Sequence, residues 1–344
     1  MRSCVLAAAV LCVLSVPAFA ADDVAAEAPK VKWVLPWKAD TALTYEVEDV
    51  DTQVRGGKTT RYRTTSTAHV AIKEVKKDGF LQTWKYEGSK FDLLEGDQAL
   101  RPMFEQVQAS AKALEAATLE VKLDKDGMFA GLRNLDAVTR QLHAVMGPVM
   151  LVAAEAQVAQ IESEQEREAA RAKLKADMGG AFDKVFTPAV VEGMVTRRIQ
   201  DYVGFHGLEL EPDQAYELDT ELPNPAGGAP FPAKLQFSMS VDEEDPDDLY
   251  VSYDMVVDPE KAAAAAMGVA EKLAGRKIDE KDAVKSVDIT DEGLFVVHRP
   301  TGIVEMFETT RTTKTEGTSK VERHRMRLVD NEHGHYWKDA EEEG

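Results

Sequence analysis

Residues 61–73 read RYRTTSTAHVAIK, and their side chains alternate in character with a period of two. One set of alternate positions becomes increasingly apolar and comprises Tyr62, Thr64, Ser66, Ala68, Val70 and Ile72. The opposite set is mainly polar and comprises Arg61, Arg63, Thr65, Thr67, His69 and Lys73. Successive side chains of a strand point to opposite sides of a sheet. The stretch therefore predicts a long β-strand with one face turned toward an interior.

Glycine-containing turns bound this strand at both ends. Gly56-Gly57 precede it and Asp78-Gly79 follow it, and both pairs favour tight hairpins because glycine tolerates positive φ. The period-two pattern continues beyond these turns and returns after residue 215. The further alternating sets are Leu43, Tyr45 and Val47; Phe80, Gln82, Trp84 and Tyr86; Tyr216, Leu218, Thr220 and Leu222; Leu235, Phe237, Met239 and Val241; and Leu249, Val251, Tyr253, Met255 and Val257.

Between these strand regions the apolar period changes to three and four residues, which is typical of amphipathic helices. One such stretch begins at Leu100, and residues 134–203 form a second, longer helical insert. Within the insert, residues 157–175 are almost wholly polar, so we expect a helix that projects into solvent. Thr187-Pro188 supply a cap and a first turn for another helix. A further helix is expected from Asp258-Pro259 to about residue 274.

Two acidic stretches with a glycine suggest that the chain repeats itself. Residues 123–129 read LDKDGMF, and residues 289–295 read ITDEGLF. In both stretches we expect a strand to end in a turn, since acidic residues followed by glycine favour turns. This similarity is compatible with a duplication into halves 33–205 and 206–330.

Hairpin-linked strands with grouped helices favour an α+β fold over a doubly wound parallel sheet. We predict a single large domain, residues 33–330, built on a curved antiparallel sheet or open half-barrel with helices packed on one face. Two similar halves within this domain are a further hypothesis.

The strand from Trp37 to Val47, the long hairpins and the acidic-glycine stretches give a layout that resembles uncharacterised secreted bacterial β-rich proteins of unknown function. The order of elements over most of the domain is also similar to that of periplasmic lipoprotein-carrier half-barrels. That second resemblance has no diagnostic motif, and the helical insert here is much larger. It implies an open sheet that holds an apolar cargo, and it assigns no individual residues.

The first twenty residues predict a signal peptide that is cleaved after Ala20, and hence a periplasmic or secreted protein. Arg2 is followed by an apolar run from Val5 to Val16 and then by the small-residue pattern that a signal peptidase recognises. Both cysteines of the chain, Cys4 and Cys12, lie in this segment. A large residue precedes Cys12, which disfavours lipoprotein processing. Residues 21–32 are expected to form a flexible linker, and residues 331–344 an acidic tail.

The formal net charge is −20 at pH 7. Such a surface repels phosphate backbones and anionic headgroups, so we expect no nucleic-acid partner. No apolar run after residue 20 reaches the roughly 18 residues that a membrane span needs, so no span is expected.

Two acidic or histidine-containing stretches are weak metal candidates. His333 and His335 have a spacing that places two imidazoles on one side of a strand, with Asp330 and Glu332 nearby, but a solvated tail is the simpler interpretation. Residues 242–248 are rich in carboxylates but lack the ligand spacing and central glycine of a calcium loop. We therefore expect a charged hairpin loop there, and no cofactor.

Motifs for catalysis are absent from the sequence. It contains no Gly-x-Ser-x-Gly elbow, no His-Glu-x-x-His helix and no glycine-rich phosphate loop. By the strand register, His69 and His324 fall on polar strand faces or near an interface. The sequence therefore favours a non-enzymatic protein. A hydrolase with paired carboxylates is the alternative, since so acidic a chain places some carboxylates close together.

The sequence instead predicts a binding protein that holds an apolar small molecule or a lipidated partner in the half-barrel. Aromatic and methionine side chains on inward strand faces could line such a cavity, although ordinary core packing is the simpler role for each. The candidate ligand-binding residues are Tyr62, Phe80, Trp84, Phe237, Met239, Tyr253 and Met255. A scaffold that binds a protein partner through the charged helix 157–175 is the other alternative.

Overall fold

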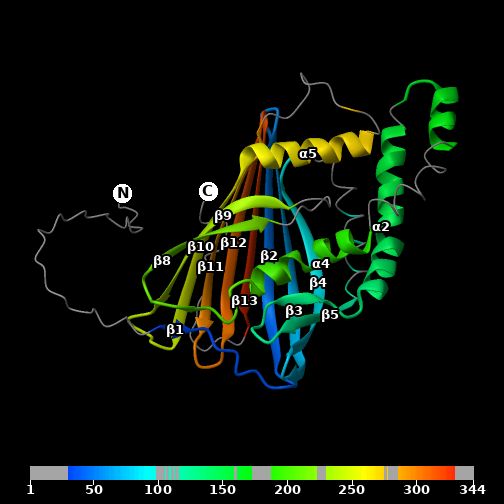
Figure 1. The fold of residues 1–344 in the computed structure, drawn as a ribbon. Coiled ribbons are helices and arrows are strands. Elements are labelled where there is room, and N and C mark those ends of the chain that lie inside the picture. The colour runs from blue at the N-terminus through cyan, green and yellow to red at the C-terminus, as the bar shows by residue number, and fades with distance from the viewer. Residues whose placement is uncertain are drawn as a thin grey trace, which may run out of the picture.

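The computed structural model describes residues 30–97, 117–158, 161–172, 187–222, 230–274 and 286–329, with a few isolated positions between them. These residues form an eleven-stranded antiparallel sheet that curves but stays open, together with packed helices, so the predicted α+β fold is confirmed (Figure 1). The predicted signal peptide, nearly all of the linker, the helix expected from Leu100 and the acidic tail with His333 and His335 lie outside this description, apart from isolated positions near residue 110.

The strands follow the order β6-β5-β4-β3-β2-β13-β12-β11-β10-β9-β8 across the sheet. Their bounds are β2 Ala42–Arg55, β3 Lys58–Lys76, β4 Gly79–Glu95, β5 Thr118–Asp124, β6 Phe129–Leu132, β8 Ala215–Leu222, β9 Phe231–Val241, β10 Asp248–Val257, β11 Asp288–His298, β12 Ile303–Thr315 and β13 Thr318–Leu328. Two short strands, β1 Val31–Lys32 and β7 Glu209–Leu210, form a separate pair.

The predicted hairpins are present. Arg55 of β2 faces Lys58 of β3 across the Gly56-Gly57 turn, in which φ is 56° and 76°. The β3–β4 hairpin closes at Gly79, where an added Cβ would lie 2.1 Å from the main-chain oxygen of Leu123. This turn therefore requires glycine, because strand β5 passes directly against it.

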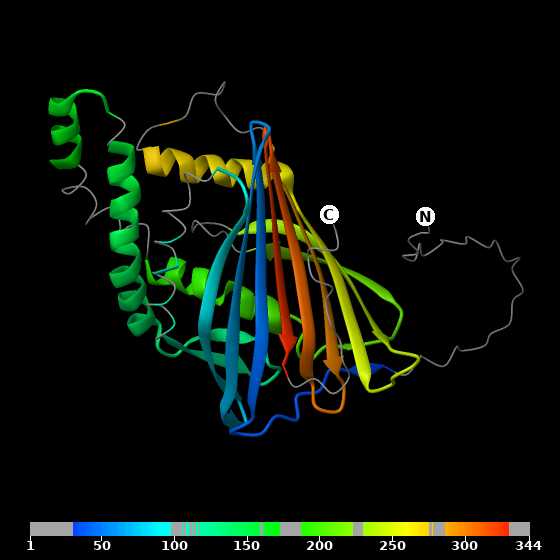
Figure 2. The same cartoon turned by 180° about the vertical axis from the view of Figure 1, so that it is seen from behind.

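The first and last long strands of the sheet pair at its centre. Strand β2 hydrogen-bonds to β13, with Val47 facing Met326 and Asp49 facing His324. As a result, β3 to β6 lie on one side of this central pair and β8 to β12 lie on the other (Figure 2). Segments from the two ends of the described chain thus complete each other's hydrogen bonds.

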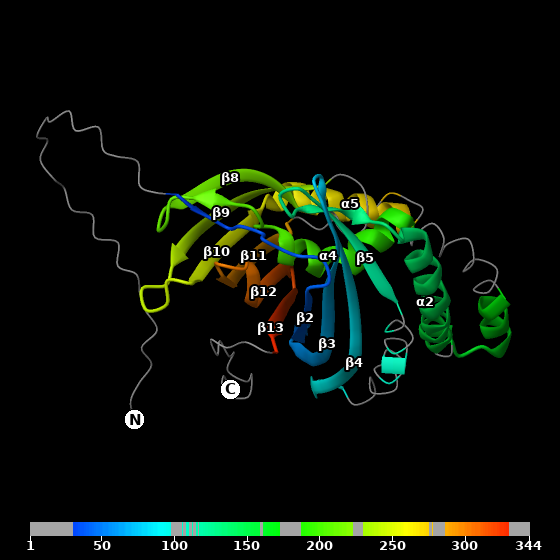
Figure 3. The same cartoon turned by 90° about the horizontal axis from the view of Figure 1, so that it is seen from below.

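Three helices complete the main architecture: α2 Leu135–Val158, α4 Pro188–Val203 and α5 Pro259–Ala274. The sheet curves around α4, which lies across its concave face, while α5 crosses the far end of β9 and β11 (Figure 3). Helix α2 packs beside α4. The predicted cap of α4 is confirmed, since the Val190 amide donates to Thr187 Oγ1 over 3.4 Å. No described helix is long and apolar enough to cross a membrane.

The structure corrects one expectation. Residues 289–295 do not form a turn, because Asp291 and Gly293 lie inside the continuous strand β11. Residues 123–129 do turn, between β5 and β6, so the two stretches do not share a conformation. The β5–β6 hairpin extends the main sheet, because β5 pairs with β4. The duplication itself remains a prediction.

Candidate functional site

Aromatic side chains form a continuous layer between α4 and the concave face of the sheet. Tyr202 near the end of α4 packs edge-to-face on Trp84 of β4, with ring centroids 5.1 Å apart. Just beyond the helix, Phe205 contacts Phe295 of β11 at 5.5 Å. We call this set the aromatic layer; its members are Trp33, Trp37, Tyr45, Trp84, Tyr202, Phe205, His206, Phe295 and Phe307. Burial of these rings supplies most of the apolar contact that holds α4 on the sheet.

Two buried tyrosines connect α4 to the sheet by hydrogen bonds. The Tyr45 hydroxyl donates to the Val304 carbonyl over 2.9 Å. Its only hydrogen is then used, so the Tyr202 hydroxyl donates to Tyr45 over the 2.9 Å between the two oxygens. Burial raises the pKa of both hydroxyls, so both stay protonated and neutral.

His206 is enclosed by the aromatic layer. Its ring lies edge-on to Trp33 and Trp37, at centroid distances of 4.9 and 5.1 Å. Nδ1 lies 3.2 Å from the Gly127 carbonyl, to which it donates as the neutral tautomer with hydrogen on Nδ1. Burial lowers the pKa of His206 to about 4, so the imidazole is neutral at physiological pH.

The aromatic layer ends at a row of charged side chains, partly buried between α4 and the middle of the sheet. We call this row the charged belt. Its members are Asp49 and Asp51 of β2, Arg197, Arg198 and Asp201 of α4, Asp291 of β11, Arg311 of β12, and Lys320, Glu322 and His324 of β13. On the other side of the belt lies a second apolar cluster under α5, which includes Met255, Val257 and Ile289.

The first part of the belt centres on Asp49. Arg198 Nη2 lies 3.2 Å from Asp49 Oδ1, and His324 Nδ1 lies 2.9 Å from the same oxygen. Burial alone would raise the pKa of Asp49, but the attraction and hydrogen bonds of His324 and Arg198 outweigh it and hold this pKa below its usual value. Of the two positions predicted for His324, the polar strand face is wrong. His324 is 1% exposed at the interface between the sheet and α4, where its cross-strand partner is Asp49.

The second part of the belt contains Arg311 and Arg197 in contrasting surroundings. Arg311 holds Asp291 through two hydrogen bonds, from Nε and Nη2 to the two carboxylate oxygens. Arg197 has a single, long contact, 3.5 Å from Nη1 to Glu322 Oε1. Glu322 also accepts from Lys320 over the shorter distance of 2.9 Å. Burial, together with repulsion from Arg311 and Arg198, lowers the pKa of the Arg197 guanidinium.

The seven predicted ligand-binding residues all project from the helix-covered face, but as packed side chains. Trp84, Phe237 and Met239 are buried in the main core, whereas Met255 belongs to the cluster under α5. Phe80 and Tyr253 are half-buried against the main core, and Tyr62 hydrogen-bonds Asp51 at the belt. The structure thus places these residues on one face without gathering them around one cavity.

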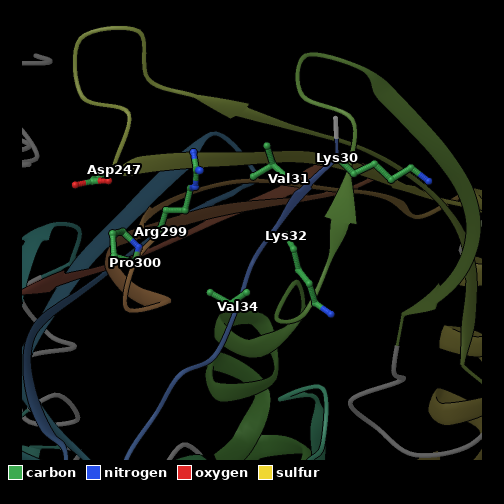
Figure 4. Close-up of a pocket in the computed structure, with 7 residues that line it drawn as sticks. All are labelled: Lys30, Val31, Lys32, Val34, Asp247, Arg299 and Pro300. Carbon is green, nitrogen blue, oxygen red and sulfur yellow. The ribbon is translucent and has the colours of Figure 1, made fainter. Parts of the chain in front are cut away.

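Two surface cavities lie away from the aromatic layer. One, of about 400 Å³, is lined by Lys30, Val31, Lys32, Val34, Asp247, Arg299 and Pro300. Figure 4 shows that the ammonium groups of its two lysines point apart instead of converging. The second, of about 350 Å³, lies beside the β3–β4 turn and includes Phe80 in its wall. Neither cavity extends to the charged belt.

The remaining histidine and carboxylate candidates make local contacts. His69 lies on the opposite face of the sheet, as predicted, with Nε2 2.8 Å from Glu87 Oε1. In the acidic stretch 242–248, the Asp242 side chain accepts from the Glu244 amide and the Tyr250 hydroxyl, which is the behaviour of a hairpin loop. Among the described residues, no three His, Asp or Glu side chains are grouped as metal ligands.

The sequence prediction missed the charged belt and the role of Trp33, Trp37 and His206. A signal for the belt was present in the register. In β2, Asp49 and Asp51 continue the same alternate positions as Tyr45 and Val47. Charged residues at inward-facing positions are the unusual observation, since burial of an unpaired charge is costly.

No protein-family model matches the chain, and no characterised protein matches its sequence. Among solved structures it is similar to lipovitellin, described for its lipid–protein interactions, with 8% identity and a TM-score of 0.41. That match covers 88% of this chain and 26% of the lipovitellin chain, so the present chain spans about a quarter of its length. It is also similar to DynF from the dynemicin biosynthesis pathway of Micromonospora chersina, with 8% identity, a TM-score of 0.20 and 95% of each chain covered. The chain shares only distant similarity with both. Its function is therefore inferred from its own geometry.

Proposed function

We propose that this protein is an exported, non-enzymatic binding protein that holds an apolar ligand against the concave face of its sheet, beneath α4. The observation that carries the proposal is the division of the α4 contact into an aromatic layer and a charged belt. The aromatic layer is a large apolar surface, covered here by the protein's own helix. Ligand binding then requires α4 to move away from this surface.

The charged belt supports such a movement. The ion pair between Arg198 of α4 and Asp49 of β2 joins side chains that are 23% and 32% exposed. Ion pairs with access to water exchange for hydration at little cost, unlike buried apolar contacts. The edge of α4 that lies on the belt is therefore the edge most easily opened, and opening there exposes the aromatic layer beneath.

The test uses a neutral apolar fluorophore, N-phenylnaphthylamine, with the fluorescence of Trp33, Trp37 and Trp84 as the energy donor. Substitution of Arg198 by Ala removes the ion pair between α4 and Asp49 of β2. We expect wild-type protein to take up the probe saturably, with energy transfer from tryptophan. Arg198→Ala should take it up several-fold faster, because it loses the ion pair that joins α4 to Asp49 of β2.

The control variant is Arg140→Ala, since Arg140 is exposed on α2. Its uptake should equal that of wild type. Absence of saturable uptake in all three proteins, with circular dichroism showing intact folds, would mean that the concave face is simply core.

A scaffold function is the second candidate, and the arrangement of residues 161–172 favours it. Residues 164–172 are helical and mostly exposed, and Arg167 binds the carbonyls of Ile161 and Glu162. This helix stands beyond α2, away from the sheet (Figure 1). Deletion of residues 157–175 should leave the melting temperature nearly unchanged while a co-purifying protein is lost; a collapsed fold would show that the segment is structural.

A further inference from the structure

Arg197 carries hydrogen-bonding capacity that the described part of the chain leaves unused. Its side chain is 31% exposed, yet its Nε and Nη2 atoms are shielded from solvent and have no hydrogen-bond partner among the residues that the structure describes. A buried donor without an acceptor is unfavourable, and more so when it carries charge. The other two guanidiniums of the belt are satisfied, Arg311 by Asp291 and Arg198 by Asp49 and Asp201.

The two unfilled atoms lie on one edge of the guanidinium. The same two atoms of Arg311, Nε and Nη2, donate hydrogen bonds to the two carboxylate oxygens of Asp291. That edge presents two parallel N–H groups, a geometry that matches the two oxygens of a carboxylate or a phosphate. The free edge of Arg197 therefore has the shape of an anion-binding fork.

Charges of both signs surround Arg197. Arg198 and Arg311 repel its guanidinium, Glu322 and Asp201 attract it, and Glu322 is itself bound more closely by Lys320. Tyr202, a member of the aromatic layer, follows Arg197 on the same helix by roughly one and a half turns. A headgroup at Arg197 thus leaves a ligand's apolar part only a short distance from that layer.

We propose that the free Nε–Nη2 edge of Arg197 binds the anionic headgroup, a carboxylate or a phosphate, of an amphiphilic ligand whose apolar part lies on the aromatic layer. This inference rests on the proposed binding function and specifies its ligand class. Because Nε and Nη2 are shielded from solvent, the headgroup reaches them when α4 moves away from the sheet at the charged belt. Arg197 is in this view the specificity-determining residue of the site.

The test compares cis-parinaric acid, a fluorescent fatty acid, with its uncharged methyl ester. We expect wild-type protein to bind the acid about tenfold or more tightly than the ester, as a charge-assisted bidentate contact allows. Arg197→Gln should lose this preference while its affinity for the ester stays unchanged. Arg197→Lys, which keeps the charge without the fork, should retain part of the preference. Arg140→Gln, on the exposed face of α2, should behave as wild type.

Thermal denaturation without ligand separates a ligand-binding role from a structural one. If Arg197 mainly supports the fold, Arg197→Gln lowers the melting temperature. If it is kept for an anion, the melting temperature is unchanged or rises, because an under-compensated cation has been removed. Competition of bound parinaric acid by oleic acid and by lysophosphatidic acid then distinguishes a carboxylate from a phosphate headgroup.

Each result is decisive. Equal binding of acid and ester by wild type would overturn the headgroup proposal and leave the apolar-ligand function standing. Failure of wild type to bind either probe would overturn both. A charge preference that survives in Arg197→Gln would place the anion elsewhere and so contradict the assignment to Arg197.

Discussion

At the scale of single residues, His206 links the stability of the concave face to pH. Its imidazole is buried among Trp33, Trp37 and Tyr202, and its pKa falls from 6.5 to about 4 on folding. In the unfolded chain the ring is protonated below pH 6.5, whereas in the folded protein it stays neutral until about pH 4. The contribution of this group to stability is therefore complete above pH 6.5 and is lost as the pH falls toward 4.

This asymmetry predicts a steep acid dependence of unfolding. The pKa of His206 is 6.5 in the unfolded chain and about 4 in the folded protein. This difference lowers the free energy of unfolding by about 3 kcal/mol between pH 7 and pH 4. His206→Gln keeps a donor for the Gly127 carbonyl but does not titrate, so its stability should fall less over this interval. Urea denaturation of both proteins across the range measures the difference; parallel curves would contradict the assignment.

At the scale of elements, β11 shows why a continuous strand can contain residues that favour a turn. The acidic-glycine stretch 291–293 predicted a turn, yet Tyr253 of β10 lies across Gly293, and an added Cβ would meet its ring at 2.3 Å. Asp291 is held by Arg311 of the neighbouring strand. Asp291 and Gly293 thus contribute to packing between neighbouring strands. Local turn preferences could not predict this role, because it depends on residues that are distant in sequence.

Two glycine substitutions should have opposite effects for this reason. Gly293→Ala forces the ring of Tyr253 from its contacts with Phe205 and Phe295 and should cost about 1–3 kcal/mol. Gly193→Ala, on the exposed side of α4 where an added Cβ meets nothing, should stabilise by about 0.5–1 kcal/mol through helix propensity. Chemical denaturation of the two variants tests the contrast, and destabilisation by both would refute it.

The same reasoning explains how much of the site could be predicted. Alternation identified the inward-facing positions of Trp84, Phe237 and Tyr253, because a strand's period is fixed by its backbone. The belt was missed because an inward charge such as Asp49 is tolerable only beside His324 and Arg198, which come from residues far along the chain. The register of β2 against β13 decides that pairing, and sequence alternation alone does not specify which strands become neighbours.

At the scale of the whole molecule, the two sides of the sheet depend on each other. Trp33 donates from Nε1 to the Gly302 carbonyl, Tyr45 donates to the Val304 carbonyl, and α4 reaches Glu322 of β13. The aromatic layer is thus shared between the first and second parts of the chain. Both parts of the chain thus contribute residues to one core, and the single domain remains a prediction.

A chain broken between residues 225 and 226 tests this dependence. We expect neither fragment to unfold cooperatively when isolated, and we expect the mixture to recover the near-ultraviolet circular dichroism of the intact protein. Independent cooperative folding of either fragment would instead indicate two domains. Intact protein, by the same argument, should unfold in a single transition whether tryptophan fluorescence or far-ultraviolet circular dichroism is followed.

The central pairing of β2 with β13 also constrains the order in which the strands can pair during folding. The β2–β3–β4 hairpins join residues near in sequence and can form early, whereas the β2–β13 pair joins the two ends of the described sheet. Contacts of such long sequence separation slow folding, because loop closure must precede them. During synthesis from the amino terminus, one long edge of β2 therefore stays unpaired until β13 has been made. That unpaired edge is where a chaperone would protect the nascent chain.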